Sequence, residues 1–117
     1  MTERLQSWDA SGLRRILALA GPVDAAMILH HLRADLTTAS DNLTLALKND
    51  DVEALRRSVH VLVALCGTAG ATCLHHKACT LRDQIGRGLD AEARALALSL
   101  KDGAVSLARL LSTELEA

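Results

Sequence analysis

Apolar side chains recur every three or four residues along five stretches of this chain, a spacing that places them on one face of an α-helix. The longest such stripe comprises Leu29, Leu32, Leu36, Ala39, Leu43 and Leu47. Leucine and alanine supply most of the apolar volume, and Trp8 is the only aromatic residue. Because β-sheets draw on β-branched and aromatic side chains, this pattern predicts an all-α fold.

Cap and turn residues indicate where the five helices begin and end. A cap at Asp9 or Ser11 is expected to begin the first helix, and Gly21-Pro22 separates it from a long second helix. A capping box formed by Asp50 and Glu53 is expected to begin the third helix. The remaining boundaries are expected at Gly70, Gly86-Arg87-Gly88 and Asp90.

The connections between these helices are too short to separate domains. A chain of this length buries about two-thirds of the surface that it exposes when unfolded, which is enough for one core. We therefore expect one helical domain over residues 1–117, folded as an antiparallel up-and-down four-helix bundle with a short additional N-terminal helix. Gly103 lies inside the last helix, where a local break is possible because glycine disfavours helix.

Charge and composition exclude several classes of partner. The net charge is −1, and without tyrosine or phenylalanine the chain has no platform for base stacking, so nucleic-acid binding is not expected. Residues 1–7 lack the apolar core of a signal peptide, and the longest uncharged run, Ser58–Leu74, is too short to span a membrane. Three cysteines without an export signal indicate reduced thiols. We expect a cytoplasmic protein that does not bind membranes.

One polar residue of the third expected helix, His60, lies off that helix's apolar stripe. The stripe comprises Leu55, Val59, Leu62 and Cys66. Arg56, Arg57 and Ala64 lie one helical turn from His60, and Gly67 lies two turns on. The small side chains leave the imidazole accessible, and the guanidinium groups favour an anion such as a phosphoryl group.

The turn at Gly70 brings a third arginine toward this histidine. Because the fourth helix is expected to fold back there, Arg82 becomes level with His60, and Ala78 becomes level with Ala64. The sequence therefore predicts an accessible imidazole among three arginines.

At these residues the sequence resembles the histidine-containing phosphotransfer (HPt) domains of multistep phosphorelays. The matching positions are His60, Leu62, Gly70 and Ala71. The helix lengths and loop positions are similar over residues 9–111. Val63 and Ala64 depart from the motif, which carries lysine and glycine there.

The resemblance implies that His60 is the phosphoacceptor, with Arg56, Arg57 and Arg82 beside the phosphoryl group. The implied docking surface for a partner comprises Val63, Ala64 and Gly67. In the family the phosphoryl group comes from an aspartate of a response-regulator receiver domain or hybrid histidine kinase and passes to another receiver. The chain has no ATP-binding motif, so the resemblance implies a monomeric phosphocarrier without its own cofactor, Mg²⁺ being held by the partner receiver.

Two other interpretations compete with phosphotransfer. Loss of the family lysine at Val63 favours a degenerate HPt-like bundle that binds a receiver or kinase without being phosphorylated. A dimeric helical interaction domain is the weaker alternative, because this chain has enough helices to form its own bundle.

We expect no functional role for the other histidines, for the cysteines or for two further apolar residues of the third helix. A metal site can be considered for Cys66, Cys73, His75, His76 and Cys79, but their spacing differs from that of structural zinc sites. We interpret the thiols as buried or half-buried and the histidines as solvated. His30 and His31 are expected on the polar flank of the second helix. Val61 and Leu65 are expected to pack, leaving Val63 for docking.

Overall fold

The structure, a computed structural model, describes residues 8–115 and is built from five α-helices. They are α1 (Ser11–Ala20), α2 (Pro22–Lys48), α3 (Val52–Ala69), α4 (Thr72–Ile85) and α5 (Ala91–Leu115). Residues 1–7, in which the sequence shows no signal-peptide core, lie outside the described residues. Within 8–115 no helix is both long and apolar enough to cross a membrane. The predicted all-α class is confirmed.

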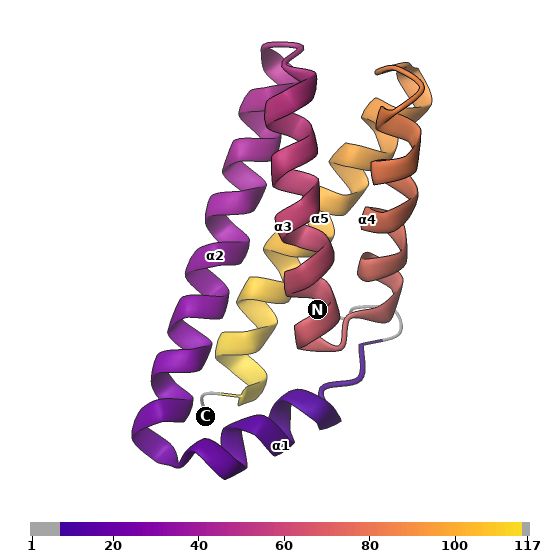
Figure 1. Ribbon diagram of the computed structural model, residues 1–117. Coiled ribbons are helices and arrows are strands. Elements are labelled where there is room, and N and C mark those ends of the chain that lie inside the picture. The colour runs from indigo at the N-terminus through magenta and orange to yellow at the C-terminus, as the bar shows by residue number, and fades with distance from the viewer. Residues whose placement is uncertain (1–7, 116–117) are drawn as a thin grey trace.

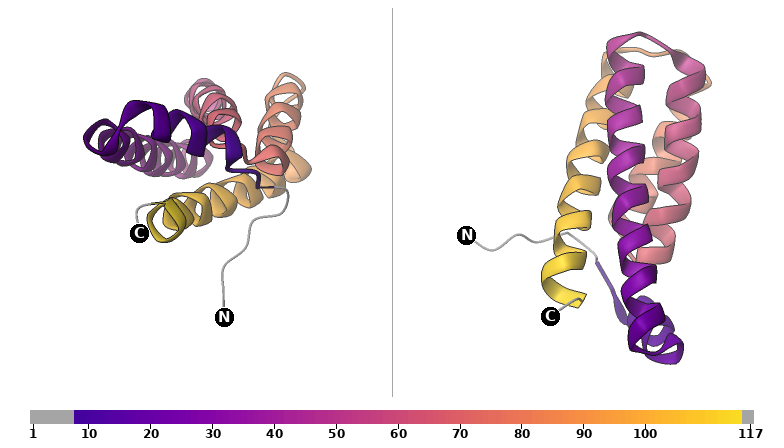
Figure 2. Two further views of the ribbon diagram at one scale, coloured as in Figure 1. Left: turned by 90° about the horizontal axis from the view of Figure 1, so that it is seen from below. Right: turned by 90° about the vertical axis from the view of Figure 1, so that its left-hand side faces the viewer.

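Helices α2 to α5 lie alongside one another, and α1 crosses near one end (Figure 1). Helix α3 packs against α2 and α4, while α5 packs against the same two helices. The end view in Figure 2 shows α1 lying across the end of α2, against which it packs. This arrangement leaves one side of α3 without a covering helix.

The apolar stripes of the helices meet in one core. The α3 stripe of Leu55, Val59, Leu62, Cys66 and Ala69 is fully buried, as the periodicity predicts. In α2 the prediction is wrong at one position, because Leu47 is half-buried and Ala46 is buried instead. Alternating steps of three and four residues lead from Leu43 to Ala46, whereas Leu47 follows a second four-residue step in a row and therefore lies to one side of the contact face.

The start of α3 differs from the prediction by one residue. Asp51, not Asp50, is the N-cap, and its carboxylate accepts a hydrogen bond from the Ala54 backbone N–H at 3.1 Å. Asp50 instead has φ of 51°, which closes the turn between α2 and α3. Its carboxylate pairs with Arg94 of α5. The predicted cap at Asp90 is confirmed, because its carboxylate accepts the Ala93 backbone N–H. The predicted cap of α1 at Asp9 or Ser11 is wrong: Ala10 is the N-cap, and Asp9, one position earlier, accepts the Ser11 N–H.

No break occurs at Gly103, and α5 continues through it. A Cβ atom at this position would overlap the side chain of Leu74 on α4. Glycine therefore allows α4 and α5 to approach closely, and the packing of Leu74 offsets the intrinsic cost of glycine in a helix.

The chain before α1 is bound to the turn between α3 and α4. Gly70, with φ of 79°, ends α3 as predicted, and its carbonyl accepts from the Asp9 N–H at 3.0 Å. The indole Nε1 of Trp8 donates to the carbonyl of Ala69, also at 3.0 Å. A Cβ atom at Gly70 would overlap the Asp9 carbonyl. The glycine thus serves both the left-handed turn and this close approach.

Candidate functional site

His60 lies in the middle of α3 with its side chain exposed. The adjacent Val59 and the residue two positions on, Leu62, are completely buried, so the helix backbone beneath the imidazole is firmly packed. His60 makes no hydrogen bond or ion pair with any residue of the described range. The imidazole is therefore exposed on a rigid support, and no described residue occupies its ring nitrogens.

Two of the predicted arginines share the helix with His60. Arg56 and Arg57, three or four positions before it, are both exposed, and the Nε atom of Arg56 lies 3.9 Å from a carboxylate oxygen of Glu53. Such a long, exposed ion pair contributes little to stability. The Arg56 guanidinium can therefore leave Glu53 for an incoming anion at small cost.

Arg82 lies on α4 with about half of its side chain exposed, and its Nε atom is 3.8 Å from a carboxylate oxygen of Asp83. If α4 packs against α3 so that Arg82 lies level with His60, then His75 of α4 lies level with Gly67 of α3. There the two helices do touch, since a Cβ atom at Gly67 would lie 3.3 Å from the Nδ1 atom of His75. This contact agrees with the predicted register near the turn, and the approach of Arg82 to His60 stays a prediction.

The three residues expected to form a docking surface do not share the same exposure. Ala64 and Gly67 are exposed, whereas Val63 is half-buried against the core. Its backbone carbonyl lies 2.9 Å from the Nδ1 atom of His75, which shows that α4 packs on this turn of α3.

Val61, expected to pack, is 42% exposed instead. The expected packing of Val61 is therefore wrong, because its side chain lies open beside α2 in the described structure. Docking at Val63, which keeps part of its surface exposed, stays a prediction. Leu65 is half-buried against the core, as expected.

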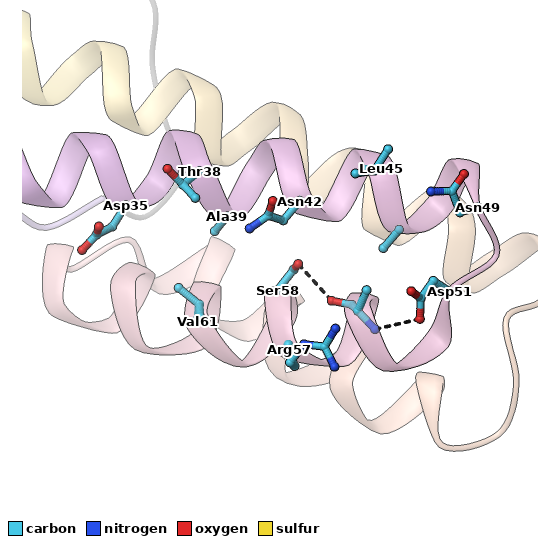
Figure 3. Close-up of a pocket in the computed structure, with 12 residues that line it drawn as sticks. Asp35, Thr38, Ala39, Asn42, Leu45, Asn49, Asp51, Arg57, Ser58 and Val61 are labelled. Atoms are coloured by element: carbon cyan, nitrogen blue, oxygen red, sulfur yellow. Dashed lines mark hydrogen bonds between the residues drawn. The ribbon is translucent and has the colours of Figure 1, made fainter.

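A groove between α2 and α3 runs beside the His60 turn and was not predicted (Figure 3). Its volume is about 510 Å³, and Arg57, Ser58 and Val61 line its α3 side. The walls include small side chains from both helices, among them Ala39, Ala46 and Ala54. Alanines and a serine at facing positions of two helices are the sequence signal that could have indicated this groove.

The remaining histidines divide into two kinds. His30, His31 and His76 are exposed, as expected. His75 is not the solvated residue that the sequence suggested: it is half-buried and contacts the Val63 carbonyl through Nδ1. Its Nε2 atom lies 3.8 Å from Sγ of Cys79. The difference arises because the His75 ring lies between α4 and α3, against the Val63 carbonyl and Gly67.

The cysteines are reduced and differ in burial. Cys66 is fully buried, and desolvation of its thiolate raises the pKa of the thiol from 9.0 to about 12. Cys73 and Cys79 are half-buried. In the part of the chain that the structure describes, no three histidine, cysteine or acidic side chains gather as a metal site.

Comparison of the chain with known protein families, curated proteins and solved structures finds no match. The chemistry of the site must therefore be argued from the residues themselves. An exposed imidazole can act as a nucleophile toward phosphorus, and nearby guanidinium groups can bind the phosphoryl oxygens.

Proposed function

We propose that this protein is a histidine phosphotransfer protein of a two-component phosphorelay. His60 accepts a phosphoryl group from an aspartate of a receiver domain and passes it to another receiver. In this proposal the chain is a cytoplasmic monomer, an antiparallel up-and-down four-helix bundle with a short additional N-terminal helix. Its partners are response-regulator receiver domains or a hybrid histidine kinase, and Mg²⁺ is supplied in the receiver.

The observation that carries the proposal is the exposure of His60 in the middle of a packed helix. Phosphoryl transfer between two proteins requires that the acceptor atom reach the partner's active site while the rest of the residue stays fixed. Buried Val59 and Leu62 fix the helix on both sides of His60. The exposed, small Ala64 leaves room for the partner surface one turn further along.

The transfer step uses the neutral form of the imidazole, in which one ring nitrogen carries a free lone pair. The lone pair of Nε2 attacks phosphorus in line, forming the P–N bond. The bond between phosphorus and the aspartyl oxygen breaks, and its electron pair returns to the receiver's carboxylate. Arg56, Arg57 and Arg82 then contribute positive charge near the transferred oxygens.

Phosphoryl transfer from a panel of receiver domains, charged with a small-molecule phosphodonor, tests the proposal. We expect the wild-type chain to acquire acid-labile, alkali-stable phosphate and His60→Gln to acquire none. His76→Gln is the matched control, because His76 is also exposed but lies on α4. Undiminished labelling of His60→Gln would contradict the proposal.

One observation favours a second function, in which the bundle binds a receiver or kinase without being phosphorylated. Val63, where the resembling family carries lysine, places no positive charge beside His60. In that case a receiver would bind wild type and His60→Ala equally well, and no receiver in the panel would transfer phosphate to either chain.

A further inference from the structure

His75 and Cys79 lie one turn apart on α4, and their side chains approach each other. The distance from Nε2 of His75 to Sγ of Cys79 is 3.8 Å. Both residues are half-buried, so neither is enclosed in the core. The phosphotransfer proposal uses neither residue.

The Nδ1 atom of the His75 ring already has a hydrogen-bond partner. Nδ1 lies 2.9 Å from the Val63 carbonyl oxygen, which can only accept, so Nδ1 carries the proton. In the neutral ring the lone pair is then on Nε2, the atom nearest Cys79. Gly67 eases this arrangement, because a Cβ atom there would lie 3.3 Å from Nδ1, in tight contact. Histidines that bind metals commonly donate their second N–H to a carbonyl in this way.

We propose that His75 and Cys79 form a two-ligand site for a thiophilic divalent cation of the Zn²⁺ class. Typical bond lengths are about 2.0–2.1 Å to imidazole nitrogen and about 2.3 Å to sulfur. An ion at those distances from two atoms 3.8 Å apart has an N–metal–S angle of about 120°, close to tetrahedral or trigonal geometry. The Cys79 thiol releases its proton to solvent on binding, and water fills the remaining coordination positions.

The other cysteines are poorer ligands. Cys66 is completely buried in the core, where desolvation disfavours the thiolate form that binds metals. Cys73 is half-buried on α4, with the exposed His76 three positions on. That pair shares the helix and the residue types of the proposed site, but no carbonyl group of residues 8–115 holds the ring of His76. Cys73 and His76 therefore provide matched controls.

Titration of the reduced, full-length chain with Cd²⁺ tests the site through the ultraviolet charge-transfer absorbance of the cadmium–thiolate bond. We expect one ion per chain, displaced by Zn²⁺. Cys79→Ser and His75→Asn should weaken binding by about tenfold or more, and Cys73→Ser and His76→Gln should not. Asparagine at position 75 retains an N–H donor for the Val63 carbonyl while removing the metal ligand, and circular dichroism reports whether each variant folds.

Alkylation of the unmodified protein gives a second readout that needs no variant. Bound Cd²⁺ should slow the reaction of Cys79 with iodoacetamide by about tenfold or more while leaving Cys73 nearly unchanged, as mapped by mass spectrometry. Equal protection of both cysteines, protection of Cys73 alone, or no protection at millimolar Cd²⁺ would overturn the proposal. None of these experiments uses a receiver, so their outcome is independent of phosphotransfer.

Discussion

The C-terminal half of α3 is hydrogen-bonded to other segments of the chain, whereas the middle of the helix is open to solvent. In its C-terminal half and at its Gly70 cap, the carbonyls of Ala69, Gly70 and Val63 contact Trp8, Asp9 and His75, respectively, from other segments. Around its middle, by contrast, Arg57 and His60 stay exposed. A helix can hold an exposed side chain in a fixed position when its opposite face is buried and its end is bonded to other segments. Helix α3 meets both conditions.

The largest expected effect comes from breaking the C-terminal turn. Gly70→Ala places a Cβ atom against the Asp9 carbonyl and forces alanine into left-handed backbone at φ of 79°. We expect a loss of about 2–4 kcal/mol in the free energy of unfolding. Urea denaturation followed by circular dichroism measures it. Gly12→Ala is the control, because a Cβ atom at Gly12 meets nothing within 4 Å, and its effect should stay within about 1 kcal/mol. Equal effects would show that the turn is not held as described.

An alkaline pH should weaken the same end of α3 through Cys66. Burial raises the pKa of this thiol from 9.0 to about 12, so the unfolded chain loses the proton first. The thiol's contribution is therefore complete below pH 9 and is lost as the pH rises toward 12. The free energy of unfolding of wild type should fall relative to Cys66→Ala by up to about 1.4 kcal/mol per pH unit in that range. Parallel pH profiles for the two proteins would contradict this expectation.

The smallest expected effect on stability is at the open middle of α3. His60→Gln replaces an exposed side chain that bonds to no described residue, so the free energy of unfolding should change by less than about 0.5 kcal/mol. The same denaturation experiment checks it. A loss comparable to that of Gly70→Ala would mean that His60 is a structural residue, and the contrast between the two halves of α3 would not hold.

Much of the helical layout follows from local sequence. Apolar spacing predicts the burial of Leu55 and Val59, and it predicts that His60 lies off the buried face; the structure confirms both. Local sequence does not predict the structure where a residue contacts a segment that is distant in the chain. Gly103 disfavours helix locally, but the approach of Leu74 from α4 makes it the residue that fits. The binding of Trp8 to the α3–α4 turn likewise depends on two segments that are far apart in the chain.

The sequence by itself determined the secondary structure, most of the core and the exposure of His60, because these depend on the 3.6-residue period of one helix and its caps. Only the tertiary structure decided that His75 is held against Val63 and close to Cys79, that Val61 lies open beside a groove, and that Gly70 admits the N-terminal segment. Each of these depends on how two helices or segments are placed against each other. Such placement is set by the packing of the whole core, which the period of a single helix does not specify.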